Sequence, residues 1–190
     1  MKAATENAAQ DSSLLVCICG GIAAYKVCHV VSHFAQRQGT VRVAMTAEAM
    51  NFVGPLTFEA LSGQPVISSL WEISDSKDPQ HINLAQRATQ ILVAPATANI
   101  LAKLVHGIAD DLVSTLLLAA SPERIILAPA MNEAMWNNPA TQANVHMLVN
   151  RNMRFIGPES GWQACRTVGM GRMSEPQAII TALTEHLAAG

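Results

Sequence analysis

The sequence predicts an α/β fold: a single domain with a doubly wound parallel sheet and helices on both faces. Short apolar runs without polar alternation recur along the chain, which is typical of strands buried on both faces. Helical segments separate these runs, and this alternation favours parallel strands joined by crossover helices. A chain of 190 residues is long enough to bury one substantial core.

The first half of the chain supplies three predicted strands and three helical segments. In chain order they are strand 14–19, helix 22–38, strand 41–45, an interrupted helix 47–61, a short strand 66–67 and a short helix 81–88. Gly20 and Gly21 break the first strand, and Gly39 stops the first helix. The polar composition of residues 72–80 predicts a loop.

The second half continues the alternation. In chain order the predicted elements are strand 91–94, helices 99–105 and 110–120, strand 125–128, a helix from the Asn132 cap through His146, strand 154–156 and helix 176–189. Pro95 and Pro129 end their strands, and Pro176 suits the first turn of the last helix. Residues 157–175 are rich in Gly, Pro and Ser and predict a long loop.

Composition excludes several classes of protein. Half of the residues are hydrophobic and 14% are charged, which is unlike a disordered chain. The formal net charge of -2 and the lack of a basic run argue against a nucleic-acid partner. No apolar run reaches the roughly 18 residues that a membrane span needs. Residues 1–12 predict a polar tail without the apolar stretch of a signal peptide, ahead of a domain over residues 13–190.

The cysteines show neither a disulfide framework nor the paired spacing of a metal site: Cys17, Cys19, Cys28 and Cys165. We therefore expect no metal. Three of the four lie near the first strand, where we expect buried thiols. This usage suits a reducing compartment, so the sequence predicts a cytoplasmic protein.

Small and polar residues follow three of the predicted strands. Gly20 and Gly21 could let backbone N–H groups approach a phosphate at a helix N-terminus, or could only make a tight turn. Thr46 could bind the same phosphate or cap a helix. Residues 97–99 (Thr-Ala-Asn) leave room for a flat ligand, and a helix cap there is compatible with binding. Because strand ends of a parallel sheet meet at one edge, the three groups together favour a phosphate-bearing cofactor.

The segment 129–136 follows another predicted strand. Asn132 is a plausible N-cap there, so an amide that donates and accepts lies at a strand-to-helix junction. A plain junction with Met and Trp in the core is the alternative. His81 is a further candidate, because its helix leads into the strand that ends near Thr97. Cys165 lies in a Gly-rich polar loop, which makes it a better candidate for reactivity than a cysteine in an apolar strand.

These motifs resemble one family closely. They are residues 20–26 (GGIAAYK), 55–63 (PLTFEALSG), 81–85 (HINLA), 94–99 (APATAN), 106–112 (HGIADDL), 129–136 (PAMNEAMW), 164–165 (AC) and 169–173 (GMGRM). The chain resembles the flavin-dependent cysteine decarboxylases over about residues 14–180, and most resembles those that act on phosphopantothenoylcysteine in coenzyme A biosynthesis. The pattern P-x-M-N-x-x-M-W after a strand is specific to this family. The resemblance implies a Rossmann-like flavoprotein fold.

The resemblance also implies bound FMN and assigns roles to matching residues. The cofactor-binding positions are Gly20, Gly21, Ile22 and Thr46 for the phosphate, and Thr97, Ala98, Asn99 and Ala130 for the flavin ring. The substrate-binding positions are Asn132 for the carboxylate, with Met135 and Trp162. The catalytic positions are His81 as a base and Cys165, on a loop that covers the substrate, as the proton donor.

The implied reaction decarboxylates 4'-phosphopantothenoylcysteine to 4'-phosphopantetheine with no net redox change. Oxidation to a thioaldehyde makes loss of carbon dioxide easy, and the resulting ene-thiol is then reduced. Two alternatives stay open: a peptidyl-cysteine decarboxylase that releases the ene-thiol, and a non-catalytic flavoprotein regulatory subunit. The Cys165 loop argues against the peptidyl-cysteine decarboxylase. The presence of His81, Asn132 and Cys165 together argues against the regulatory subunit.

The resemblance implies partners as well. The family implies a homotrimer or a multiple of trimers, and in many bacteria a synthetase that makes the substrate is fused to this domain. The sequence departs from the family pattern at Gln86, where a basic residue is common, and at Arg166, where glycine is common. Trp162 is unusually bulky for its loop. These departures concern phosphate recognition and loop closure.

Overall fold

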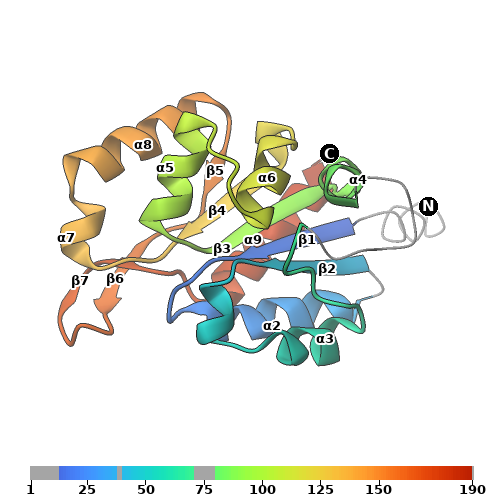
Figure 1. The fold of residues 1–190 in the computed structure, drawn as a ribbon. Helices are drawn as coiled ribbons and strands as arrows, with labels where there is room; N and C mark the ends of the chain where they lie inside the picture. Colours follow the sequence, from blue (N-terminus) through green and yellow to red (C-terminus); the bar gives the residue numbers. More distant parts are fainter. Residues whose placement is uncertain (1–12, 38–39, 71–79, 190) are drawn as a thin grey trace.

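The protein has three layers, in which helices cover both faces of a parallel β-sheet (Figure 1). The computed structural model describes residues 13–37, 40–70 and 80–189. The expected tail at residues 1–12, the helix stop at Gly39 and nearly all of the expected loop at 72–80 lie outside these residues. None of the helices in the described residues is long and apolar enough to cross a membrane.

The sheet confirms the predicted fold class. Its five parallel strands are arranged in the order β2-β1-β3-β4-β5. Their bounds are β1 (Ser13–Ile18), β2 (Thr40–Met45), β3 (Gln90–Ala96), β4 (Ile125–Pro129) and β5 (Arg154–Phe155). From β1 the chain passes to β2 on one side of β1, and then to β3, β4 and β5 in turn on the other side. The strand order therefore reverses between β1 and β3, and sheets of this kind bind their ligands at such a switch point.

Alternate residues of the buried strands face opposite layers. In β1, Val16 and Ile18 belong to one core, and Leu15 and Cys17 belong to the other. The first core packs α2 (Ala24–Ala35), α3 (Pro55–Ser62) and α9 (Pro176–Ala189) against the sheet, with the short η1 (Ala49–Asn51). The second packs α4 (Gln80–Arg87), α5 (Ala98–His106), α6 (Leu112–Leu118) and α8 (Pro139–Asn150). Strands apolar on both faces therefore produce a sheet covered on both sides.

The sequence predicted a single helix after Asn132, but the structure contains two helices there. Asn132 does cap α7 (Glu133–Trp136), but a second helix, α8, begins at Pro139. Asn138 has an extended backbone, and its Oδ1 accepts a hydrogen bond from the N–H of Ala140 at 2.9 Å. A residue before proline is disfavoured in the helical region, so the chain turns there and starts a new helix.

Two strand predictions also need correction. Residues 66–67 do not form a strand: Ile67 makes only an isolated bridge to Ala44 of β2. Pro95 does not end β3, which continues to Ala96. The pairing of β3 with β4 shifts register between Val93 and Ala96. A proline, which has no N–H to donate, is tolerated at such an irregularity.

The long loop expected at residues 157–175 is largely a β-hairpin. β6 (Glu159–Trp162) pairs antiparallel with β7 (Val168–Arg172), and the two form a separate sheet. In Figure 1 the hairpin lies beside α7, at the end of the main sheet where β4 terminates. The short η2 (Pro122–Arg124) precedes β4, and the last helix, α9, has the predicted bounds. The hairpin is thus placed next to the strand ends where the candidate site residues lie.

Candidate functional site

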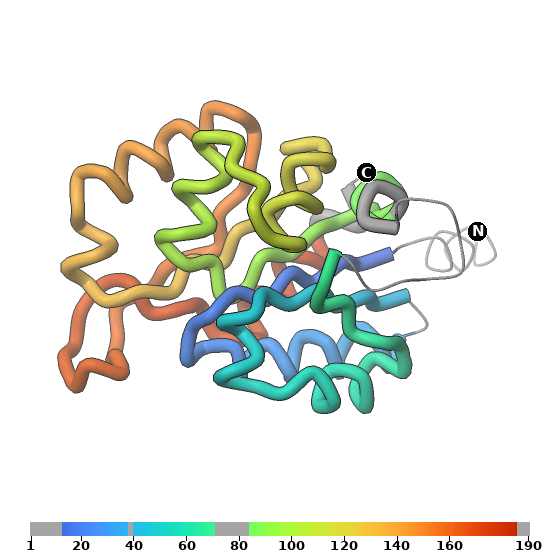
Figure 2. Tube along the Cα trace, viewed as in Figure 1, coloured from blue at the N-terminus to red at the C-terminus, as the bar shows by residue number. Residues whose placement is uncertain are grey.

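The carboxyl ends of β1, β3 and β4 gather most of the predicted site residues at one edge of the sheet (Figure 2). Gly20 and Gly21 follow β1, and Thr97 follows β3. A side chain on Gly21 would lie 3.3 Å from Cγ of Pro95 and 3.9 Å from Cγ2 of Thr97. The glycine turn therefore lies directly against the end of β3, at the point where the strand order reverses. This is the crevice in which doubly wound sheets hold their ligands.

The N-terminus of α2 has the properties of a phosphate site. Ala23 precedes the helix and provides no side-chain cap. Within the described residues no hydrogen bond occupies the N–H groups of Gly21, Ile22 and Ala23. Such N–H groups, together with the helix dipole, favour an anion. A Cβ on Gly20 would overlap Cβ of Glu48, so this turn needs glycine for close approach of the chain.

Thr97 acts as a cap, as one interpretation of the sequence held, and Thr46 makes a similar hydrogen bond to the first residue of η1 without being its N-cap. The buried Thr46 Oγ1 accepts a hydrogen bond from the N–H of Ala49 at 3.2 Å. The Thr97 Oγ1 accepts one from the N–H of Ile100 at 3.3 Å. Each hydroxyl keeps its own proton for a further acceptor. Capping therefore does not exclude contact with a phosphate or a flavin.

The remaining predicted cofactor residues lie close by. Ala98 and Asn99 begin α5, directly after Thr97. Ala130 follows β4, and its N–H donates to the carbonyl of Ala96 at 3.0 Å. The ends of β3 and β4 are thus tied together, with alanine side chains on both segments. Small side chains at this edge suit a flat ring.

Asn132 is held as an N-cap with part of its amide free. Its Oδ1 accepts a hydrogen bond from the N–H of Met135 at 2.8 Å. The Nδ2 group has no partner among the described residues, so its two donors are available to a ligand. The Met135 side chain is about half exposed, at 46%. The junction therefore presents an amide donor beside an accessible apolar side chain.

The β6–β7 hairpin docks on this junction through its backbone. The N–H of Met131 donates to the carbonyl of Gly171 at 2.9 Å. In the other direction, the N–H of Met170 donates to Oε1 of Glu133 at 3.2 Å. A Cβ on Gly171 would overlap the Met131 carbonyl, and one on Gly169 would lie 2.5 Å from the carboxylate of Glu133. This contact therefore requires glycine at position 171, whereas a side chain at position 169 would force the Glu133 carboxylate to move.

Cys165 lies in the turn of the hairpin and is exposed. Its Sγ lies 3.0 Å from Oγ1 of Thr167 and donates to Oε1 of Gln163 at 3.5 Å. Trp162, at the end of β6, is 62% exposed. Arg166 adopts a left-handed backbone with φ 65°, a conformation that glycine, the residue expected here from the resemblance, adopts without strain. The hairpin thus joins Cys165 and Trp162 to the same region as Asn132.

The other cysteines lie in a different environment. Cys17 and Cys19 are buried, as the sequence predicted, and Cys28 is half-buried. Burial raises the pKa of the Cys19 thiol to about 12 and that of Cys17 well above its usual range. Thiolates are therefore disfavoured at both positions. Among the described residues, no group of three or more His, Cys, Asp or Glu could hold a metal ion.

His81 is not brought to this site by the fold of one chain. Its backbone lies in the first turn of α4, and its side chain lies outside the described residues. The last turn of α4 is tied to the beginning of the sheet, because Oγ of Ser13 donates to the carbonyl of Arg87 at 2.7 Å. Figure 1 shows α4 at the opposite end of the sheet from β6 and β7. The sequence grouped His81 with the other candidates, and the tertiary structure separates them.

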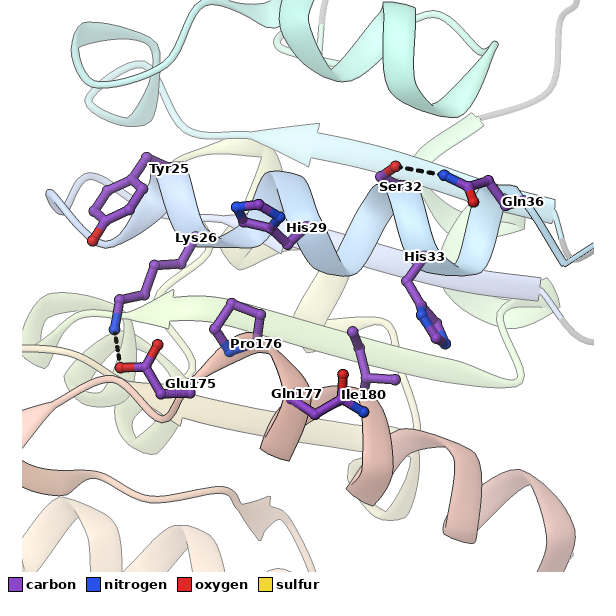
Figure 3. A pocket seen from close by; sticks show the side chains of 10 residues that line it. All are labelled: Tyr25, Lys26, His29, Ser32, His33, Gln36, Glu175, Pro176, Gln177 and Ile180. Atoms are coloured by element: carbon purple, nitrogen blue, oxygen red, sulfur yellow. Dashed lines mark hydrogen bonds and ion pairs between the residues drawn. The ribbon is translucent and has the colours of Figure 1, made fainter.

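A groove of about 630 Å³ lies elsewhere, between α2 and the beginning of α9 (Figure 3). None of the predicted site residues lines it. In it, Nζ of Lys26 donates to Oε1 of Glu175 at 3.0 Å, and this bond lowers the pKa of the Glu175 carboxyl. Lys26 of the GGIAAYK motif therefore ties α2 to the chain that leaves β7. Its role here is to connect two parts of the fold.

Sequence reasoning missed two residues of the site, Gln163 and Glu133. The side chain of each crosses to the other segment: Oε1 of Gln163 accepts from the N–H of Glu133 at 3.1 Å, and Oε1 of Glu133 accepts from the N–H of Met170 at 3.2 Å. Gln163 is buried, which is unusual for its type. Its only sequence signal was its place two residues before Cys165, and nothing in the sequence indicated its partners.

Comparison with known proteins then decides the family. The profile of a family described as Flavoprotein matches residues 2–188. The chain belongs to the flavoprotein family. This confirms the membership that the motifs predicted.

This flavoprotein has close relatives in bacteria. It is 43% identical over 178 residues to the coenzyme A biosynthesis bifunctional protein CoaBC of Bacillus subtilis, covering 94% of this chain and 44% of the relative. It is 42% identical over 169 residues to the CoaBC protein of Escherichia coli K12, and the match covers 89% of this chain and 41% of that relative. The flavoprotein thus spans less than half the length of these curated relatives.

Solved structures agree with the flavoprotein fold. An FMN-dependent cysteine decarboxylase, SpaF, superposes with a TM-score of 0.80 at 33% identity, over 95% of this chain and 99% of that one. A cysteine-to-serine mutant of PPC decarboxylase, complexed with pantothenoylaminoethenethiol, gives a TM-score of 0.81 at 27% identity, over 94% and 99%. The Rossmann-like flavoprotein fold expected from the sequence is therefore confirmed.

The left-handed backbone of Arg166 gives a prediction about stability. A left-handed conformation costs a non-glycine residue roughly 1–2 kcal/mol, and the extra chain entropy of glycine offsets about 0.5–1 kcal/mol of this. Arg166→Gly should therefore raise the free energy of unfolding by about 0.5 kcal/mol, measured by urea denaturation. Ala164→Gly, in the same turn but without a positive φ, should lower it. Equal changes in the two variants would contradict the assignment of strain to Arg166.

Proposed function

We propose that this protein is an FMN-dependent decarboxylase that converts 4'-phosphopantothenoylcysteine to 4'-phosphopantetheine. The observation that carries the proposal is the docking of the β6–β7 hairpin, whose turn carries Cys165, on the residues either side of Asn132. Relatives named for coenzyme A biosynthesis support the same substrate. The synthetase that makes this substrate is then the enzyme expected to supply it.

The edge of the sheet fits FMN. The free N–H groups at the start of α2, with the hydroxyl of Thr46, would hold the phosphate. Thr97, Ala98, Asn99 and Ala130 would lie along the ring. When bound, FMN supplies the two-electron oxidation of the substrate thiol and the later return of those electrons. The protein's own contribution is to bind, orient and exclude water.

The substrate would be held by groups that the structure leaves available. The Nδ2 of Asn132 would donate to the carboxylate that is lost, and Met135 and Trp162 would cover the apolar part of the arm. Cys165 would give a proton to the carbon next to the one that receives hydride. A thiol is a much stronger acid than a serine hydroxyl, so it suits this step. The base, His81, must then reach the site from elsewhere.

An alternative function is decarboxylation of a peptide that ends in cysteine. The 33% identity to SpaF, named as an FMN-dependent cysteine decarboxylase, supports decarboxylation of a cysteine without specifying what carries it. The Cys165 turn favours the first proposal, because only that reaction ends with a reduction that needs a proton donor. A regulatory flavoprotein without activity would need neither the Asn132 donor nor the thiol.

One incubation separates these functions. Purified protein loaded with FMN is given phosphopantothenoylcysteine or, in parallel, a peptide ending in cysteine, and carbon dioxide and products are followed by mass spectrometry. We expect carbon dioxide and 4'-phosphopantetheine from the first substrate only. Release of an ene-thiol from the peptide would support the alternative. FMN binding with no carbon dioxide from either would refute both.

Two substitutions of Asn132 separate its role as a helix cap from its proposed role as a donor to the substrate. Asn132→Ala removes both the cap and the donor, whereas Asn132→Asp keeps the acceptor for the N–H of Met135 and removes the donor. A hydrogen bond to a charged group contributes roughly 1.5–3 kcal/mol, so both variants should lose roughly 10- to 150-fold in kcat/KM and keep FMN. Only the Ala variant should also lose about 1 kcal/mol of stability. If the Asn132→Asp variant turned over substrate at the wild-type rate, Asn132 would be only a helix cap and the proposed contact with the substrate would be wrong.

The distance between α4 and the hairpin supports an oligomer with shared sites. We propose a homotrimer, or a multiple of trimers, in which His81 of one copy serves the Asn132 and Cys165 of another. Exposed apolar side chains such as Ile22 and Leu56, at 57% and 74%, suit burial between copies.

Mixing two inactive variants tests this arrangement. His81→Asn and Asn132→Ala proteins, unfolded and refolded together, should regain activity, because about a quarter of the shared sites would combine intact groups from two copies. Light scattering should give a trimer or a multiple of it. Full activity of a monomer, or no recovery in refolded mixtures, would overturn the proposal.

A further inference from the structure

Gln163 is a buried amide that contacts three parts of the site at once. Its side chain is 7% exposed. Its Oε1 accepts hydrogen bonds from the N–H of Glu133 at 3.1 Å and from Sγ of Cys165 at 3.5 Å. Its Nε2 donates to the carbonyls of Gly169 at 3.2 Å and Met170 at 2.7 Å. One side chain therefore joins the start of α7, the strand β7 and the turn that carries the thiol.

The backbone of Gln163 also closes this turn. Its N–H donates to the carbonyl of Thr167 at 2.9 Å, and its carbonyl accepts from the N–H of Arg166 at 2.9 Å. Glu133 reinforces the arrangement from the other side through its bond to the N–H of Met170. Removal of the amide would leave a backbone N–H and two carbonyls without this partner in a partly buried place. Such loss is costly, so the hairpin would loosen there.

We propose that Gln163 is a positioning residue that holds the Cys165 thiol in place relative to Asn132. The proposal rests on the proposed function. In the last step, the Cys165 thiol would give its proton to one carbon of the ene-thiol, and the neighbouring carbon would receive the hydride that bound, reduced FMN would supply. The thiolate left on Cys165 regains a proton from water. Gln163 contacts neither carbon and acts through the thiol.

The position of the thiol matters only for the last step. Oxidation and loss of carbon dioxide do not use Cys165, whereas protonation needs its Sγ within reach of one carbon. Misplacement of a reacting group by about 1 Å can cost roughly 100-fold in rate. Loss of Gln163 should therefore leave oxidation and loss of carbon dioxide intact and slow the final reduction.

The first readout is the ratio of products. Gln163→Met preserves volume and removes all four side-chain hydrogen bonds. We expect FMN binding and carbon dioxide release within about twofold of wild type, with final reduction slowed roughly 10- to 100-fold. A product two mass units lighter than 4'-phosphopantetheine should then accumulate, as it should in the reference variant Cys165→Ser. Gln163→Glu, which keeps the acceptors and loses the donors, should accumulate less of it and serves if the Met variant does not fold.

Gln90 provides a matched control. It is also a buried glutamine, 2% exposed, and its Nε2 donates to the carbonyl of Leu183 at 3.2 Å. It begins β3, at the opposite end of the sheet from the site. Gln90→Met should lower stability as Gln163→Met does, with the product ratio unchanged.

The second readout does not need turnover. Alkylation of Cys165 by iodoacetamide, followed by peptide mass spectrometry, reports how the turn holds the thiol, and the buried Cys17 and Cys19 do not compete. Gln163→Met should change the alkylation rate at Cys165 at least threefold, and Gln90→Met should not. If wild type releases no carbon dioxide, the proposed function fails and alkylation alone decides the role of Gln163. If Gln163→Met lowered stability but kept the wild-type product ratio and the wild-type alkylation rate, Gln163 would have only a structural role and the proposal would be overturned.

Discussion

The contact between the β6–β7 hairpin and the segment after β4 is the constraint on which the site depends. It brings together residues that are far apart in sequence, through the backbone bond from Met131 to Gly171 and the side chains of Glu133 and Gln163. Because the two backbones approach so closely, only glycine fits at position 171. The hairpin therefore cannot be treated as a loose cover. Its base is fixed to the site, and its turn carries the thiol.

Helix capping and ligand binding share the same polar groups at the strand ends. Thr97 and Asn132 each use one oxygen as a cap, as the plain structural interpretation expects. The cap fixes the side chain in one orientation and leaves its N–H or O–H donors available. Capping thus prepares these groups for a ligand, since an ordered side chain loses less entropy on binding. The two interpretations of these residues are compatible for this physical reason.

The fold of one chain completes only part of the proposed site. Strand ends meet at one edge of a parallel sheet, so Gly20, Thr97 and Asn132 are gathered by the topology itself. His81 begins a helix that leads into the opposite end of β3. α4 has only eight residues, a length of about 12 Å, and its last turn is tied to the beginning of the sheet by the Ser13–Arg87 bond, so its first turn does not reach the carboxyl ends of strands that are about 20 Å long. This separation is the reason for proposing that a second copy supplies the base.

The sequence by itself determined what depends on near neighbours: the apolar strands, the bounds of α9 and the Asn132 cap, which follow from periodicity and hydrogen bonds within a few residues. Only the tertiary structure decided the rest. Residues 157–175 have the composition of a loop, and they form a hairpin because each strand pairs with the other and both pack on α7. The partners of Gln163 and the separation of His81 likewise depend on where distant segments meet. No local pattern encodes that, because the free energy comes from contacts between segments and not within them.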